Sequence, residues 1–153
     1  GAIDKRYFVL VRGKWRDALR AVELSLSSYV TGDGERRVRV DSAGRLARTI
    51  FRRVKVWPQA DPPVALLAAE LETGRTHQIR VHLTHLGFPL AGDDKYGDFA
   101  WNKVLARQGL KRMFLHAHRI RFTHPVDGRE VVVEAPLASD LAAFVARLDA
   151  ADG

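Results

Sequence analysis

The chain has 153 residues, of which 46% are hydrophobic and 28% are charged, a size and composition typical of one globular domain. It contains no Cys, which excludes disulfides, iron–sulfur clusters, thiolate zinc sites and cysteine nucleophiles. The longest apolar run, residues 64–69, is far shorter than the ~20 residues that cross a bilayer. We therefore expect a soluble, cytoplasmic protein that does not bind membranes.

Basic residues outnumber acidic ones by 25 to 18, and 19 of the basic residues are Arg. Eight cations lie within residues 36–55 beside a single acid, Asp41, so this segment alone carries a net charge of +7. Such clustering is typical of a protein that binds a phosphate backbone, and the planar fork of Arg suits phosphate recognition. A general Arg and Ala bias, or a solvated basic face without a partner, are the alternatives at this point.

In chain order, β-branched and aromatic residues predict strands over residues 7–11 and 21–30, with a turn at residues 31–34. Apolar and basic side chains alternate in the next two strand-like segments, which Ser-Ala-Gly at residues 42–44 joins. This pattern predicts a hairpin with a basic outer face, formed by residues 37–40 and 49–57. The nearly all-apolar residues 64–71 predict a central strand.

The second half of the chain predicts a mixture of helices and strands. Thr76 is expected to cap a helix over residues 77–85, which Gly87 closes. The remaining elements are a loop, a helix, two strands joined by a turn at residues 124–128, and a terminal helix, over residues 90–98, 101–108, 113–122, 130–134 and 139–148. No repeat or linker divides the chain. We expect a single α+β domain with a mixed, largely antiparallel sheet and flanking helices.

The densest run of polar residues lies where the predicted central strand turns into the next helix. Residues 72–82 read Glu-Thr-Gly-Arg-Thr-His-Gln-Ile-Arg-Val-His. Two Arg side chains and the N–H groups of a helix start converge there, an arrangement typical of an anion or carboxylate site. Helical spacing places His77 and Arg80 on one face, and Gln78 and His82 on another. One face can therefore serve a pocket while the other serves the core.

Several further motifs surround this run. Upstream, residues 4–13 read Asp-Lys-Arg-Tyr-Phe-Val-Leu-Val-Arg-Gly. Downstream come Leu-Gly-Phe-Pro-Leu, Gly-Asp-Asp-Lys-Tyr-Gly-Asp, Phe-Leu-His-Ala, Phe-Thr-His-Pro and Glu-Ala-Pro-Leu, at residues 86–90, 92–98, 114–117, 122–125 and 134–137. In this order, and together with residues 74–82, the motifs resemble the C-terminal part of the catalytic domain of the RluA-type RNA pseudouridine synthases. The resemblance spans nearly the whole chain.

This resemblance implies isomerisation of uridine to pseudouridine in RNA, with large-subunit ribosomal RNA as the expected substrate. No atom or electron is gained overall, so we expect no cofactor and no metal. The family's arginine, which pairs with a nucleophilic Asp, matches Arg80; its active-site tyrosine matches Tyr7, and its apolar residue under the base matches Leu115. From the charge pattern and the motif we expect these residues to contact RNA: Arg36, Arg37, Arg39, Arg52, Arg53, Lys55, Arg75 and His77.

One family motif does not occur in these 153 residues. The family's nucleophilic Asp lies in a His-Arg-Leu-Asp motif ahead of the tyrosine motif, and no such motif is found. The N-terminal RNA-binding domain of the ribosomal enzymes is also absent, so we expect a C-terminal fragment that is inactive by itself. Exposed sheet edges in such a fragment favour self-association. The alternative from another functional class is a non-catalytic RNA-binding module.

The acidic residues of the 92–98 motif allow two further interpretations, both of which we disfavour. Asp93, Asp94 and Asp98 belong to a different family motif, so we do not expect one of them to replace the nucleophile. His82 and His85 are three residues apart and lie near these acids in sequence. They belong to an amphipathic helix, however, and a metal site is not the expected use of them.

Overall fold

The structure is a computed structural model that describes residues 4–71 and 76–152. Its main sheet has six strands in the order β2-β5-β6-β1-β7-β8, and all neighbouring strands pair antiparallel. The strands are β1 (Asp4–Arg12), β2 (Leu19–Glu23), β5 (Arg48–Trp57), β6 (Val64–Leu71), β7 (Leu115–Thr123) and β8 (Glu130–Glu134). A separate hairpin consists of β3 (Leu26–Val30) and β4 (Arg36–Val40). The predicted α+β class with a largely antiparallel sheet is confirmed.

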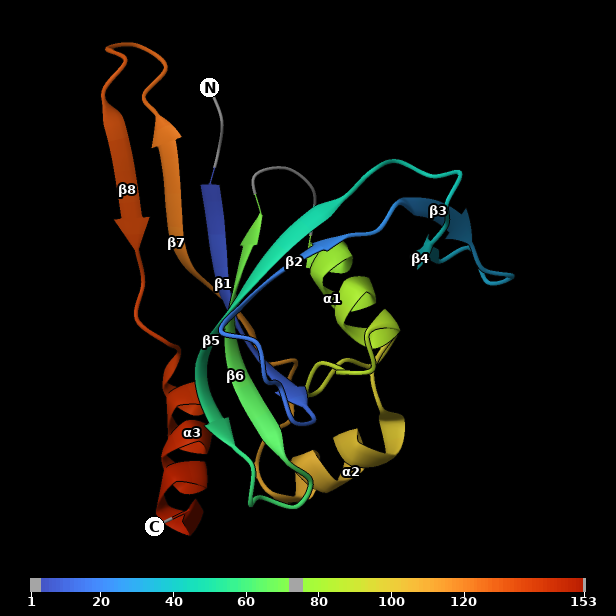
Figure 1. Ribbon diagram of the computed structural model, residues 1–153, viewed down its shortest axis with the longest axis vertical. Coiled ribbons are helices and arrows are strands. Elements are labelled where there is room, and N and C mark those ends of the chain that lie inside the picture. Colours follow the sequence, from blue (N-terminus) through green and yellow to red (C-terminus); the bar gives the residue numbers. More distant parts are fainter. Residues whose placement is uncertain (1–3, 72–75, 153) are drawn as a thin grey trace.

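The helices α1 (Thr76–His85) and α3 (Ser139–Asp152) cover opposite faces of this sheet, and α2 (Phe99–Arg107) lies near its lower end (Figure 1). Successive side chains of β1 point to opposite faces of the sheet, so this strand contributes to a hydrophobic cluster on each face. Val9 and Val11 pack in the cluster that contains residues of α1, whereas Leu10 packs in the cluster that contains residues of α2 and α3. In the described part of the chain, no helix is both long and apolar enough to cross a membrane.

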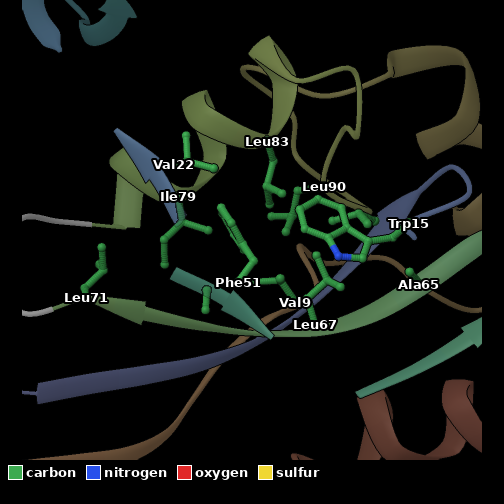
Figure 2. Packing of buried hydrophobic residues seen from close by; sticks show 12 residues of the cluster. Val9, Trp15, Val22, Phe51, Ala65, Leu67, Leu71, Ile79, Leu83 and Leu90 are labelled. Atoms are coloured by element: carbon green, nitrogen blue, oxygen red, sulfur yellow. The ribbon is translucent and has the colours of Figure 1, made fainter. Parts of the chain in front are cut away.

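One of the two clusters of the core lies under α1. Ile79 and Leu83 point from the helix toward Phe51, Val9 and Leu67 of the sheet (Figure 2). All five side chains are fully buried. Burying an apolar side chain of this size contributes about 1.5–3 kcal/mol, so this contact holds α1 on the sheet.

A buried polar network fixes how α1 is rotated on that face. Gln78 Nε2 donates to the Arg48 carbonyl oxygen (2.9 Å) and to Thr49 Oγ1 (3.1 Å). Thr49 Oγ1 is hydrogen bonded to His82 Nδ1 (2.9 Å), and His82 Nε2 to the Leu24 carbonyl oxygen (3.0 Å). Burial lowers the pKa of His82, so the neutral ring is favoured, with Nε2–H donating to Leu24 and Nδ1 accepting from Thr49. Such a network specifies one arrangement because each member left without a partner is costly.

The end of α1 is a glycine-dependent turn, as predicted. Gly87 has φ 88°, its N–H donates to the Thr84 carbonyl oxygen (3.0 Å), and the Phe88 N–H donates to the Leu83 carbonyl oxygen (2.9 Å). This pair of hydrogen bonds is a Schellman motif, which needs a left-handed residue at the position of Gly87.

The sequence-based prediction is wrong for residues 21–30, which form parts of two strands in different sheets. The predicted hairpin of residues 37–40 and 49–57 is also wrong, because β4 pairs with β3 and β5 lies between β2 and β6. The chain passes so close to β3 at Gly44 that a Cβ there would lie 2.2 Å from the Leu26 carbonyl oxygen. Arg45 and Leu26 then exchange two backbone hydrogen bonds of 2.8 Å. Alternation defines which side chains share a face, not which strands pair.

The other predicted elements are present, β6 and β8 with the predicted ends and the rest with ends shifted by one to four residues. The central position of β6 is confirmed, as is the turn at residues 124–128 between β7 and β8. α2 begins at Phe99 because Asp98 Oδ1 accepts the Trp101 N–H (3.0 Å) as its N-cap. At one edge of the sheet, β8 exposes Val132 and Val133. Self-association through such an edge stays a prediction.

Replacing Thr49 with Val tests the network under α1. Thr49→Val keeps the shape of the side chain but leaves His82 Nδ1 and one Gln78 donor without the Thr49 hydroxyl. We expect the free energy of unfolding to fall by about 1–3 kcal/mol, measured by urea denaturation. Thr123→Val, at an exposed strand position, is the matched control, with an expected change within about 0.5 kcal/mol. Equal effects of the two variants would contradict this account of the network.

Candidate functional site

A buried ion pair holds the guanidinium group of Arg80. Its Nε donates to Asp93 Oδ2 (2.9 Å) and its Nη2 to Asp93 Oδ1 (2.7 Å). Asp93 Oδ1 also accepts the backbone N–H groups of Lys95 and Tyr96, each at 3.0 Å. Burial by itself raises the pKa of Asp93, but the hydrogen bonds from Arg80 and from these two N–H groups outweigh it and lower the pKa. Asp93 is therefore a carboxylate that fixes the plane of the Arg80 fork.

The loop that carries Asp93 depends on two close backbone approaches. Gly92 has φ 78°, and a Cβ there would lie 2.3 Å from the Arg112 carbonyl oxygen; a Cβ at Gly97 would lie 2.5 Å from the Asp93 carbonyl oxygen. Asn102 of α2 spans the loop, because its Nδ2 donates to the Asp93 carbonyl oxygen (2.7 Å) and its Oδ1 accepts the Gly92 N–H (2.9 Å). The loop therefore presents the Asp93 carboxylate in one position.

Tyr96 connects this loop to both α1 and the β3–β4 hairpin. Its ring lies 5.0 Å from Arg80 Cζ. Its Oη accepts the Val38 N–H of β4 (2.9 Å) and is hydrogen bonded to His77 Nδ1 (2.9 Å), while its carbonyl oxygen accepts a hydrogen bond from Thr84 (2.7 Å). One side chain thus covers the Arg80 guanidinium and anchors the hairpin.

Tyr7 and Leu115 lie together on the sheet face that α1 covers. In the register of β1 and β7, Val9 lies opposite Leu115 and Tyr7 opposite Ala117. Tyr7 and Leu115 both pack against the cluster that contains Ile79, the residue before Arg80. Burial raises the pKa of Tyr7, so the neutral phenol is favoured. The arrangement offers a planar apolar surface and a phenol near the start of α1.

The structure does not join all three predicted catalytic residues by direct contacts. Within residues 4–71 and 76–152, no hydrogen bond links Tyr7 to Arg80, whose guanidinium instead contacts Asp93 and Tyr96. Asp93 and Tyr96 were not among the predicted site residues. Both residues belong to the Gly-Asp-Asp-Lys-Tyr-Gly motif of residues 92–97, which the sequence analysis singled out. The sequence does not show, however, that this loop folds back against α1.

The residues predicted to contact RNA are spread over two sheets. Arg36, Arg37 and Arg39 lie on β4, in the hairpin, whereas Arg52, Arg53 and Lys55 lie on β5. Their RNA contacts stay a prediction, and His77 faces the hairpin through Tyr96. Arg75 lies outside the described residues.

Several of these cations already have carboxylate partners. Arg37 Nη2 lies 3.4 Å from Glu35, and Arg52 Nε lies 3.7 Å from Glu70. Lys55 pairs with Asp149 of α3. The +7 segment is therefore not one uniform basic surface, because part of its charge is used to fasten elements of the fold together.

The histidines and acids of the disfavoured metal interpretation are used elsewhere. His82 is bonded to Thr49 and to the Leu24 carbonyl oxygen, and Asp93 to Arg80. In the part of the chain that the structure describes, no group of three or more His, Asp or Glu side chains is placed to hold a metal ion.

Comparison with known proteins defines the class of this chain. Residues 1–85 match the family model described as RNA pseudouridylate synthase. The chain therefore belongs to this family, and the resemblance of its motifs to the RluA-type members is confirmed.

Within the family, the motifs are similar to those of ribosomal large subunit pseudouridine synthase C. Curated relatives of that name are also similar to this chain over most of its length. The protein of Haemophilus ducreyi is 40% identical over 148 residues, which cover 97% of this chain and 45% of the relative. That of Escherichia coli (strain K12) is 40% identical over 141 residues, 91% of this chain and 43% of the relative. The chain thus spans less than half the length of these relatives.

Solved structures support the same fold. Human RNA pseudouridylate synthase domain containing 1 matches with a TM-score of 0.69 at 24% identity, over 97% of this chain and 66% of that structure. Human RNA pseudouridylate synthase domain containing 4 matches with a TM-score of 0.66 at 23% identity, over 96% of this chain and 62% of that structure.

Asp93→Asn tests the ion pair. The substitution removes the buried counter-charge of the Arg80 guanidinium and leaves only the exposed carboxylate of Asp94 near it, so we expect the free energy of unfolding to fall by about 3–5 kcal/mol. Asp94→Asn is the control, because its side chain is 87% exposed and lies 4.0 Å from Arg80; we expect a change of less than about 1 kcal/mol. Urea denaturation of both variants provides the comparison. If Asp93→Asn is as stable as Asp94→Asn, the pair does not hold the site.

The histidines predict how stability depends on pH. Burial lowers the pKa of His77, His82 and His118 in the folded chain, and for His77 the charges of Arg80 and Lys95 add to it. The unfolded chain therefore binds these protons more readily. The stabilisation is complete above the unfolded His pKa of about 6.5 and is lost as the pH falls below it.

Urea denaturation across neutral to mildly acidic pH measures this effect. We expect His77→Gln to reduce the slope of unfolding free energy against pH, because the variant loses one of the three contributing groups. His85→Gln, at an exposed position of the same helix, is the control. A slope that is identical in wild type and His77→Gln would rule out a contribution from His77.

Proposed function

We propose that this chain contributes Arg80, Tyr7 and Leu115 to the uridine site of an enzyme that converts uridine to pseudouridine in large-subunit ribosomal RNA. The main support is the buried ion pair of Arg80, in the middle of α1, with Asp93. α1 covers the sheet face that also holds Tyr7 and Leu115. In this reaction the bond from ribose C1′ to N1 of uracil breaks, and a bond from C1′ to C5 forms. C5 loses a proton and N1 gains one, so the overall change is an isomerisation.

Arg80 is suited to hold a second carboxylate. It uses two of its five N–H donors on Asp93, which leaves donors for an incoming acid. A guanidinium that is already fixed in its plane keeps such an acid ionised and oriented, through charge pairing and bidentate hydrogen bonding. We propose that the nucleophilic Asp of the family's His-Arg-Leu-Asp motif takes this position in the active protein.

Tyr7 and Leu115 are suited to receive a flat base. An extruded uridine needs surfaces that replace its stacking partners, and a tyrosine ring beside an apolar side chain provides them. Burial raises the pKa of Tyr7, so its hydroxyl is protonated near neutral pH and must give its own proton to another group before it accepts the one from C5. We propose that Tyr7 stacks on the base and takes part in the proton transfer from C5.

The RNA substrate is supported by charge and by the names of the relatives. Arg36 and Arg39 of the hairpin have no carboxylate within 4.0 Å among the described residues, and such cations bind phosphates. The relatives of about 40% identity are named as large subunit ribosomal enzymes. We propose the same class of substrate here, with binding of RNA in the cytoplasm and without a cofactor.

The central prediction concerns activity. Residues 1–153 contain no His-Arg-Leu-Asp motif, so we expect this chain alone to form no pseudouridine in large-subunit ribosomal RNA, as measured by nucleoside chromatography. A chimera that places the preceding segment of the Escherichia coli relative before Asp4 is expected to be active. In that chimera Arg80→Ala should lower the rate by about 10²-fold or more, and Arg107→Ala on α2 should leave it unchanged.

Other outcomes have distinct meanings. Conversion by residues 1–153 alone would contradict the assignment of the nucleophile and would make Asp94 and Asp98 the next residues to replace. RNA binding by an inactive chimera would favour the non-catalytic RNA-binding module. Equal activity of Arg80→Ala and Arg107→Ala would overturn the role of Arg80.

A further inference from the structure

A cavity of about 370 Å³ lies between the β3–β4 hairpin and the start of α1. Its walls come from β3, from β4, from residues 45–47 and from His77 and Gln78 of α1. Its described lining includes neither Tyr7 nor Leu115. Ligand pockets typically measure about 300–1,000 Å³, so the volume suits one small group and not a nucleic-acid duplex.

Two guanidinium groups that have no carboxylate partner among the described residues line this cavity. Arg36 and Arg45 belong to it, and neither has a carboxylate within 4.0 Å among the residues that the structure describes. Arg36 Nη2 donates to the hydroxyl of Ser28 (3.2 Å), another lining residue. By contrast, four other cations of residues 36–55 are paired with acids. Within the described part of the chain, the cavity therefore brings together two cations of this segment that have no acid partner, which favours an anion.

The remaining lining is not that of a simple phosphate site. Leu26, Val38 and Leu46 form an apolar wall. Gln78 directs its Nε2 to β5, so its carbonyl oxygen is the atom left to accept a hydrogen bond in the cavity. A nucleotide combines the matching properties, since its phosphate is anionic, its base is flat and its base edge carries donors and acceptors.

The cavity also shares a wall with the Arg80 site. His77 lines the cavity, its Nδ1 is hydrogen bonded to Tyr96 Oη (2.9 Å), and the Tyr96 ring lies 5.0 Å from Arg80 Cζ. His77 and Tyr96 therefore connect the cavity to the Arg80 guanidinium.

We propose that this cavity is a subsite for a second nucleotide of the RNA strand, next to the uridine that is rearranged. Arg36 and Arg45 bind its phosphate groups, Leu26 and Leu46 contact the face of its base, and Gln78 accepts a hydrogen bond from its edge. The inference rests on the proposed function, because it takes single-stranded RNA as the ligand. The cavity then contributes to the choice of target site.

Binding of a short oligouridylate to this chain, measured by fluorescence anisotropy over a range of salt concentrations, tests the charged part. We expect Arg36→Ala and Arg45→Ala each to weaken binding by about tenfold and to reduce the salt-dependence slope by about 0.7. Arg107→Ala removes the same charge from exposed α2 and is expected to change neither. Equal losses in all three variants would show general charge attraction and would overturn the subsite.

A second pair of variants tests the location without removing an arginine. Leu46 is 74% exposed at the cavity, and Val126 is 88% exposed in the turn between β7 and β8. Both side chains are exposed, so either is expected to accept Glu without unfolding, which thermal denaturation checks. We expect Leu46→Glu to weaken oligouridylate binding by about fivefold or more and Val126→Glu to leave it unchanged. Equal binding by the two variants would overturn the proposal.

An abasic oligonucleotide of the same length separates base from phosphate recognition. We expect wild type to bind the uridine chain about two- to tenfold more tightly than the abasic chain, and Leu46→Glu to lose this preference. If wild type binds the uridine chain and the abasic chain equally, the cavity recognises phosphate alone. That result would overturn the nucleotide subsite but not the proposed function. A wild-type chain that binds neither probe would instead contradict the RNA partner on which both proposals rest.

Discussion

The structure around the site depends on one constraint, that a buried guanidinium must be paired. Arg80 is buried in the middle of α1, and Asp93 accepts two hydrogen bonds of 2.9 and 2.7 Å from its guanidinium. Because removing either partner leaves an uncompensated buried charge, the loop at residues 92–97 must return to α1. That return places Tyr96 over Arg80, and the Tyr96 hydroxyl in turn fixes Val38 of the hairpin. The position of the candidate site and the position of the β3–β4 hairpin therefore both depend on the ion pair of Arg80 and Asp93.

The sheet provides two faces with different tasks. On one face, α1 and a buried polar network of Thr49, Gln78 and His82 bring the helix start to Tyr7 and Leu115. On the other face, α3 packs in the second hydrophobic cluster of the core. The basic segment crosses between the hairpin and β5, and half of its eight cations are paired with acids. The net charge of a segment therefore does not locate a binding surface by itself, because paired cations hold the fold together and only those without an acid partner among the described residues are candidates to bind an anion.

Local patterns predicted most elements correctly, but they gave the wrong partner for the strand of residues 37–40. The apolar run of β6, the Gly87 turn after α1 and the hairpin of β7 and β8 each depend on residues close in sequence, and each was predicted. The split of residues 21–30 between two sheets, and the pairing of β4 with β3, depend on contacts such as Gly44 against Leu26. Alternating side chains are compatible with several partners, so sequence pattern alone does not choose among them.

By itself, the sequence determined the class of fold, the family and the residues Tyr7, Arg80 and Leu115 as site candidates, because motifs and periodicity are local properties. Only the tertiary structure showed that Asp93 pairs with Arg80 and that Tyr96 links α1 to β4. It alone placed Arg36 and Arg45 around one cavity. These relations join residues far apart in the chain, and they are decided by which buried charges and backbone groups find partners when the loop, the hairpin and the helix pack together.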